Sequence, residues 1–234
     1  MIDGDLLKSE IKALVFDQYG TIVDMQGGLT EAVTDFLRGK GWDGEAHRFV
    51  TWWRRTHFEN SMIDALSEGP HTPYREIGQQ AVAYVMDRCG FNYTQEEVRW
   101  LVSEIERLKP FPDVIAALEQ LAGTYKLAIL SNGDVDMLEA AKPYIGFPFD
   151  HVISVQAAGY FKPHKATYKK AAEILDLAPE NTLFVANHAF DSLGSKSFRI
   201  RTALIEPPTL PLGHSPRPPD SPINDFTPRA ELLS

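Results

Sequence analysis

The sequence predicts an α/β protein whose parallel sheet is interrupted by an inserted block of helices. A short apolar run at residues 13–16 stops abruptly at Asp17 and is followed by turn residues, which is typical of a strand buried on both faces. Residues 25–110 show helical spacing of apolar positions and no strand pattern. Residues 113–205 then alternate between strand and helix patterns. Strands separated by helices of this length form a parallel, doubly wound sheet.

The inserted block contains several predicted helices, two of which have clear end signals. Thr72 and Pro73 suit an N-cap followed by proline at the first helical position, and Gly90 suits the end of that helix. Thr94 and Glu97 have the spacing of a capping box at the start of the next one. The helices are expected at about residues 29–39, 45–66, 73–90 and 94–108.

Beyond a hinge with two prolines at residues 109–112, strands are expected to alternate with helices. Residues 206–222 are rich in proline, which cannot donate to a sheet, so they are expected to run over the surface as a tail. The predicted organisation is a Rossmann-like core of residues 1–24 and 111–234 with a helical cap subdomain of residues 25–110. Strands are expected at residues 126–130, 151–155, 182–186 and 202–205, and helices at 113–122, 135–141, 165–175 and 191–198.

The composition favours a soluble enzyme or binding protein over a nucleic-acid or membrane protein. The net charge is −9 and no block of lysine and arginine stands out, which disfavours a polyanionic partner. There is no apolar run long enough to span a bilayer, and the N-terminal residues lack a signal-peptide pattern. Cys89 is the only cysteine, so an intrachain disulfide is excluded and a cytoplasmic location is expected.

Polar side chains follow the predicted strands at the edge where parallel sheets bind ligands. Asp17 follows the first strand, and Ser131 and Asn132 follow the second. Lys162 lies shortly after the third, and Asp191 lies shortly after the fourth. Each has an ordinary structural explanation as a helix cap or a solvated charge. Their gathering at one edge of one sheet instead indicates an active site.

In this order, the residues resemble the haloacid dehalogenase superfamily, and within it the L-2-haloacid dehalogenases. The resemblance extends from Leu14 to about Ile205 and includes the helical cap. Phosphatases of this superfamily need a second aspartate two positions after the nucleophile to protonate a leaving alkoxide. Here the motif at residues 17–21 has Tyr19 at that position. A halide is a weak base and needs no proton, so the resemblance implies halide displacement.

The resemblance also implies a role for each of the other residues. Arg54 matches the cap arginine that receives the halide, and a guanidinium suits charge developing on a leaving atom. Lys162 would hold Asp17 and Asp191 ionised side by side, since like charges otherwise raise one pKa. Substrate binding is assigned to Gln18, Thr21, Ser131, Asn132 and Tyr168.

One stretch departs from the family pattern. The usual serine before the last turn is Ala186, and the usual asparagine is His188. An imidazole can donate or accept a proton near neutral pH. The base that activates the hydrolytic water is therefore expected to be either Asp191 or His188.

The implied reaction has two steps. Asp17 attacks C2 of a short 2-haloacid and expels the halide, leaving an ester between enzyme and substrate. Water then opens the ester and releases a 2-hydroxyacid of inverted configuration. Neither a metal nor another cofactor is expected, and the resemblance implies a homodimer.

Three other functions stay open on the sequence alone. A related hydrolase could act on another 2-substituted or strained-ring carboxylate. A Mg²⁺-dependent phosphatase is disfavoured by Tyr19, and a non-catalytic binding protein by the retention of Asp17, Arg54, Lys162 and Asp191 together. The halogen, the chain length and the handedness of the substrate depend on cap residues 62–74, where the family match is weakest.

Overall fold

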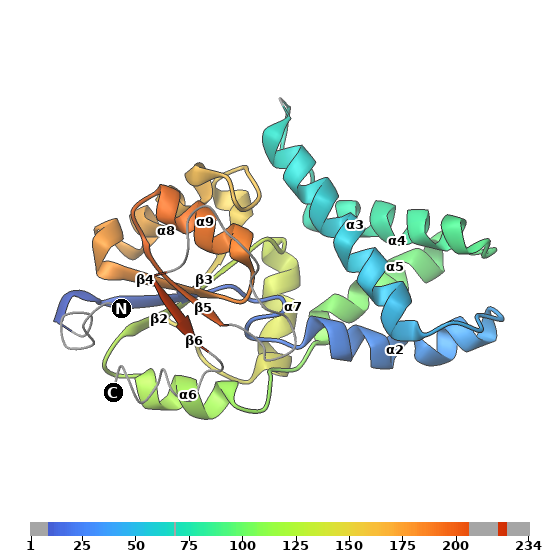
Figure 1. Ribbon diagram of the computed structural model, residues 1–234, viewed down its shortest axis with the longest axis horizontal. Coiled ribbons are helices and arrows are strands. Elements are labelled where there is room, and N and C mark those ends of the chain that lie inside the picture. The colour runs from blue at the N-terminus through green and yellow to red at the C-terminus, as the bar shows by residue number, and fades with distance from the viewer. Residues whose placement is uncertain (1–8, 68, 206–219, 224–234) are drawn as a thin grey trace.

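The computed structural model describes residues 9–67, 69–205 and 220–223. Within these ranges the chain forms one sheet of six strands in the order β3-β2-β1-β4-β5-β6, with every neighbouring pair parallel. The predicted doubly wound parallel sheet is therefore confirmed (Figure 1). The strands are β1 (Ala13–Phe16), β2 (Lys126–Ser131), β3 (His151–Ser154), β4 (Thr182–Ala186), β5 (Arg201–Ile205) and β6 (Ser221–Ile223).

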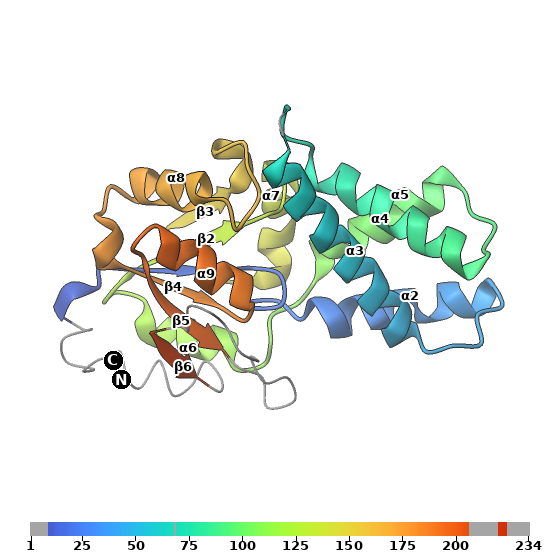
Figure 2. The same cartoon turned by 45° about the horizontal axis from the view of Figure 1, so that its top comes forward.

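Strand β1 lies in the middle of the sheet, and its side chains enter both hydrophobic layers. Leu14 and Phe16 belong to one cluster, while Ala13 and Val15 belong to the cluster on the opposite face. Helices cover the two faces, so that β1 is fully buried, as its unbroken apolar run predicts (Figure 2). The sheet and its helices, called the core below, include α6 (Val114–Leu121), α7 (Val135–Ile145), α8 (Lys165–Leu175) and α9 (Ala189–Ser197).

The segment between β1 and α6 is mostly helical and lies to one side of the sheet (Figure 1). Gly90 ends α4 with φ +72°, and Thr94 and Glu97 form the predicted capping box at the start of α5. None of the helices in the described ranges is long and apolar enough to span a membrane. These elements, called the cap below, are α2 (Met25–Gly39), α3 (Ala46–Leu66), α4 (Tyr74–Cys89), α5 (Gln95–Ser103) and the 3-10 turn η1 (Glu104–Arg107).

The predicted start of α4 is wrong by one residue, and its cap is not local. The helix begins at Tyr74, so Pro73 occupies the N-cap position instead of the first helical position expected for it, and Thr72 is not the N-cap. The carboxylate of Asp134, from the core, accepts hydrogen bonds from the backbone N–H groups of Tyr74 and Arg75 at 2.8 and 2.9 Å. A charged oxygen satisfies free N–H groups well at a helix N-terminus. Asp134 thereby ties the cap to the core.

The C-terminal residues also differ from the expectation. Residues 221–223 do not run over the surface but pair with β5 as the parallel edge strand β6. Proline is tolerated there because the outer side of an edge strand needs no N–H donor. The Asp220 carboxylate accepts a hydrogen bond from the backbone N–H of Thr202 at 2.9 Å, which fixes the start of β6 beside β5. The rest of the predicted tail, residues 206–219, lies outside the described residues.

Candidate active site

The carboxyl ends of the central strands bring three charged side chains together beneath the cap. Lys162 lies between Asp17 and Asp191, and its Nζ is 2.8 Å from Asp17 Oδ1 and 2.8 Å from Asp191 Oδ2. All three side chains are almost completely buried. The backbone N–H of Lys162 donates to Asn132 Oδ1 at 3.0 Å, which fixes the lysine loop against the end of β2. The structure thus joins residues that are 145 positions apart in the sequence.

Burial and the shared lysine move the pKa values of the two carboxyl groups in opposite directions. Burial alone raises the pKa of Asp17, but the Lys162 ammonium and His188 outweigh it and hold that pKa well below its usual range. Burial raises the pKa of Asp191 above its usual value, and the Asp17 charge adds to this against the opposing effect of Lys162. Asp17 is therefore the group kept ionised at neutral pH, as a carboxylate nucleophile must be.

The second carboxylate oxygen of Asp17 faces polar groups of β1 and β4. The Thr21 hydroxyl donates to Asp17 Oδ2 at 2.8 Å, and the backbone N–H of Asn187 donates to Thr21 Oγ1 at 3.0 Å. His188 Nδ1 lies 3.6 Å from the same carboxylate oxygen. Thr21 therefore orients the nucleophile, while His188 approaches it from the solvent side of the sheet edge.

Asp191 is fully buried and has two side-chain partners. It lies in the first turn of α9, which begins at Ala189, two residues earlier than predicted. Besides its contact with Lys162, it accepts the Tyr168 O–H at 2.6 Å. Tyr168 is itself fully buried against Phe184. Tyr168, predicted to bind the substrate, is thus a partner of Asp191 in this structure.

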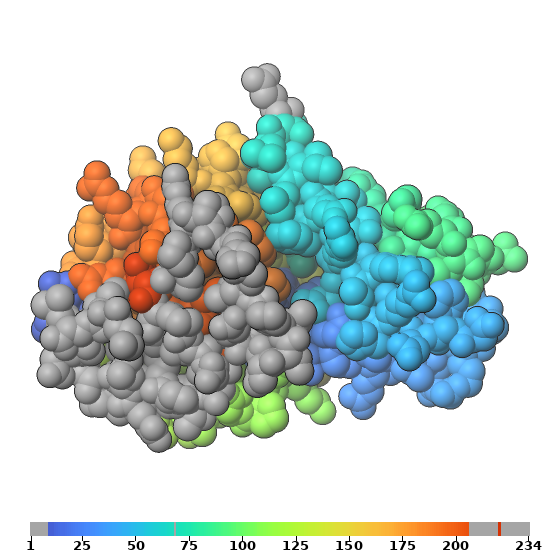
Figure 3. All heavy atoms as spheres, viewed as in Figure 1, coloured from blue at the N-terminus to red at the C-terminus, as the bar shows by residue number. Residues whose placement is uncertain are grey.

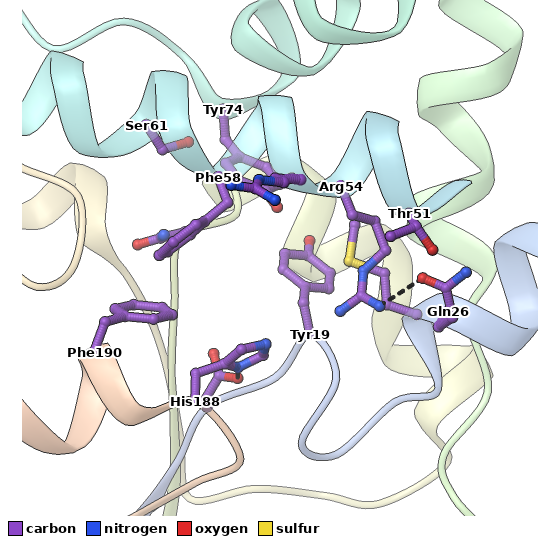
Figure 4. A pocket seen from close by; sticks show the side chains of 13 residues that line it. Tyr19, Gln26, Thr51, Arg54, Phe58, Ser61, Tyr74, His188 and Phe190 are labelled. Atoms are coloured by element: carbon purple, nitrogen blue, oxygen red, sulfur yellow. Dashed lines mark hydrogen bonds and ion pairs between the residues drawn. The ribbon is translucent and has the colours of Figure 1, made fainter. Parts of the chain in front are cut away.

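A cavity of about 300 Å³ lies between the cap and the core above Asp17. Figure 4 shows the cap side chains reaching down from α3 and α4 toward those of the core. In Figure 3, atoms of the cap lie directly against atoms of the core. Four aromatic side chains contribute to the walls, so a small apolar group fits beside the polar atoms. The core contributes Asp17, Tyr19, Asn132, His188 and Phe190, and the cap contributes Met25, Gln26, Thr51, Arg54, Arg55, Phe58, Ser61 and Tyr74.

Arg54 reaches into this cavity from α3 and is held in place by Gln26. Its Nη1 donates to Gln26 Oε1 at 2.9 Å, and Gln26 Nε2 donates to the backbone oxygen of His47 at 3.0 Å. The guanidinium therefore has a fixed orientation over the cavity, opposite the core residue His188 (Figure 4). Arg54 and Asp17 line the same cavity, as the sequence predicts.

Several predicted substrate ligands do not line the cavity. Thr21 and Tyr168 are engaged by Asp17 and Asp191, as described above. Ser131 forms the end of β2, where its hydroxyl oxygen accepts the Gly133 N–H at 3.2 Å. Gln18 faces a separate cavity of about 550 Å³ beside the C-terminal end of α7. Of the five residues assigned to substrate binding, only Asn132 lines the cavity above the nucleophile.

The aromatic walls of the cavity were missed from the sequence. Phe58 and Phe190 pack with their ring centroids 4.4 Å apart, and Tyr19 stacks on Tyr74 at 5.5 Å. Helical periodicity identifies such residues as apolar positions but cannot say which of them face a ligand. Gln26 was missed for the same reason, because its partner Arg54 comes from another helix.

The comparisons with known proteins agree with this geometry. The family of haloacid dehalogenase-like hydrolases matches residues 11–197. An (S)-2-haloacid dehalogenase of Xanthobacter autotrophicus is 35% identical over 197 residues, which are 83% of this chain and 75% of that protein. The haloacetate dehalogenase H-2 of Moraxella sp. (strain B) is 31% identical over 199 residues, which are 84% of this chain and 86% of that protein.

A solved structure gives the same relationship in three dimensions. The L-2-haloacid dehalogenase of Xanthobacter autotrophicus with chloropropionic acid covalently bound superposes with a TM-score of 0.86 at 29% identity. The match covers 95% of this chain and 98% of that one, so it includes both the cap and the core. Sequence, fold and site geometry lead to one conclusion: the chain belongs to the haloacid dehalogenase-like hydrolases.

Proposed function

We propose that this chain hydrolyses short (S)-2-haloacids to 2-hydroxyacids through an ester on Asp17. The observation that carries the proposal is a buried carboxylate kept ionised by Lys162 at the floor of a small cavity, with a phenol at position 19 in place of a second acid. Tyr19 is stacked on Tyr74 and cannot serve as the strong acid that an alkoxide leaving group requires. A halide is a weak base and leaves without being protonated.

In the first step, an oxygen of Asp17 forms a bond to C2 of the substrate as the carbon–halogen bond breaks and its electron pair leaves with the halide. The substrate lies in the cavity between the Asp17 carboxylate and the Arg54 guanidinium. Arg54 stabilises the departing anion because its charge is permanent and its orientation is fixed by Gln26. Asn132 supplies an amide near the substrate carboxylate.

In the second step, water attacks the carboxyl carbon of Asp17 and the bond from that carbon to the ester oxygen breaks. One proton of the water passes to a base and the other ends on the hydroxyl group of the product. The geometry favours His188 as the base, because it lines the cavity and lies 3.6 Å from Asp17. Asp191 is fully buried and already engaged by Lys162 and Tyr168.

The experiment that tests the proposal measures halide release from the two enantiomers of 2-chloropropionate. We expect stoichiometric chloride and lactate of inverted configuration from the (S)-acid, with at least about tenfold slower release from the (R)-acid. Phosphate release from a small phosphomonoester with Mg²⁺ is measured in parallel. Phosphate without chloride would replace the proposal by a phosphatase, and turnover of only non-halogenated 2-substituted acids would replace it by another hydrolase.

Organisation, assembly and location are part of the same proposal. We propose a cap of residues 25–110 inserted in a core of residues 1–24 and 111–234, which is supported by the run of helices from α2 to η1 with no strand among them in the described residues. A homodimer is supported by the family resemblance, and a cytoplasmic location by the single cysteine.

A further inference from the structure

Two side chains from different parts of the fold meet at Gly20, beside the nucleophile. A Cβ atom placed on Gly20 would lie 3.1 Å from Cε1 and 3.7 Å from Nε2 of His188, and 3.3 Å from Nη2 of Arg54. The imidazole from the core and the guanidinium from the cap therefore flank one narrow gap. Gly20 also has φ +86°, a conformation that glycine adopts without strain. Because Gly20 has no side chain, the space between the imidazole and the guanidinium stays open.

The same imidazole ring also reaches the nucleophile at its other end. Nδ1 of His188 lies 3.6 Å from Asp17 Oδ2, while the Nε2 side of the ring faces Arg54 across the gap (Figure 4). In a displacement, the attacking oxygen, the carbon and the leaving atom lie roughly in a line. One ring nitrogen therefore lies near the attacking oxygen, and the other faces Arg54, the group that would receive the leaving atom in the proposed function.

The neighbours of His188 dictate how its two nitrogens are used. The Asp17 carboxylate only accepts hydrogen bonds, so Nδ1 is best satisfied as a donor. The Arg54 guanidinium only donates, so a neutral ring turns the lone pair of Nε2 toward it. A halide between them accepts from Nη2 of Arg54, and it accepts from Nε2 when the ring carries a second proton. The ring also packs against Phe190 with 5.4 Å between centroids, and Phe58 packs on Phe190.

We propose, on the basis of the function above, that His188 and Arg54 form a two-donor site for the leaving atom, and that the enzyme therefore also removes fluoride from short 2-fluoroacids. Fluoride is the smallest and most basic halide, so it fits a narrow gap and gains most from strong N–H donors. Bromide is large, weakly basic and leaves readily. A second donor therefore changes the rate most for the fluoride substrate.

The proton balance closes over the two steps of the reaction. As Asp17 displaces fluoride, the electron pair of the carbon–fluorine bond leaves on fluorine, and the protonated His188 donates a hydrogen bond from Nε2 to the departing anion. Fluoride then leaves the cavity and the ring loses one proton to solvent. The ring is then neutral, and it takes a proton from the water that attacks the ester on Asp17. The cycle returns the protonated ring, and the net products are the 2-hydroxyacid, fluoride and one proton in solution.

The test compares leaving groups in the variant His188→Asn, which keeps a polar side chain of the kind usual in the family. Halide release is measured in a single turnover with 2-fluoro-, 2-chloro- and 2-bromopropionate, so that ester hydrolysis does not enter the rate. We expect fluoride release to fall by about 10²-fold or more and bromide release by less than about tenfold. His151→Asn changes a partly exposed histidine at the first residue of β3, at the far end of that strand from the active site, and serves as the matched control, with no change in the order of the three halides.

Each outcome separates this inference from the proposed function. Equal losses with all three halides would overturn the leaving-group role of His188, as would chloride release without any fluoride release by the unchanged enzyme. Failure to release halide from any of the acids would instead refute the proposed function itself. A loss of rate confined to fluoride release supports both the proposed function and the leaving-group role of His188.

Discussion

Replacing Asp17 with asparagine is expected to abolish halide release while leaving the protein folded. The amide has nearly the same shape but no charged oxygen to form the ester, so we expect a loss of at least about 10⁴-fold in the rate of chloride release. The fold should persist because Lys162 keeps its contact with Asp191 and Thr21 can still donate to the amide oxygen. Chloride release and thermal unfolding are measured on the same samples.

The control for this variant is Asp35→Asn. Asp35 lies on α2 with its side chain 90% exposed and pairs only with Arg38 in the same helix. Its replacement should leave both the rate and the unfolding temperature unchanged. If the Asp17 variant released chloride within tenfold of the unchanged enzyme, another group would have to be the nucleophile and the role given to Asp17 would be lost.

The second large effect is expected from Lys162→Met, which removes the charge between two buried carboxylates. Breaking a buried ion pair on one side leaves an uncompensated charge and costs about 3–5 kcal/mol of folding free energy. The pKa of Asp17 should also rise, because the effect of burial is then no longer opposed by the lysine charge. Activity should therefore disappear at a higher pH on the acid side than in the unchanged enzyme. Thermal unfolding and the pH dependence of kcat/KM measure the two effects separately.

The sign of this pH effect follows from the direction of the shift. The pKa of Asp17 is depressed in the folded protein, so its stabilising effect is present above about pH 3.9 and is lost as the pH falls through the lower folded value. A higher pKa of Asp17 in the folded protein narrows the pH range in which its carboxylate is ionised. Lys165→Met, an exposed lysine at the start of α8, should change neither quantity. If the acid limb of the pH profile of kcat/KM did not move in the Lys162 variant, the electrostatic role given to Lys162 would be contradicted.

The sequence predicts the parts of the site that depend on local pattern and on sheet geometry. The apolar run that ends at Asp17 identifies β1, and the carboxyl ends of parallel strands meet at one edge. Lys162 and Asp191 follow the third and fourth runs at this same edge, so their meeting with Asp17 could be expected before the fold was known. Arg54 needed the family resemblance, because nothing in its own helix distinguishes it from a solvated arginine.

The features that could not be predicted depend on contacts between distant segments. The start of α4 is set by Asp134, 60 residues away, which outweighs the local signal of Thr72 and Pro73. Helix α7 continues past Pro143 to Ile145, where the sequence suggested an end at Ala141, because Ile145 packs into the core. A helical period gives the apolar face of a helix but not its partner, so the aromatic walls of the cavity emerge only from the fold.

The measurement that tests the central claim most directly is a single turnover of (S)-2-chloropropionate in ¹⁸O-labelled water, with enzyme in excess. An ester on Asp17 that is opened at its carboxyl carbon leaves the labelled oxygen on the enzyme. We therefore predict unlabelled lactate and one ¹⁸O atom in the peptide that contains Asp17, as detected by mass spectrometry. Labelled lactate from the first turnover, with no label on Asp17, would show that water attacks the substrate directly and would contradict the covalent mechanism.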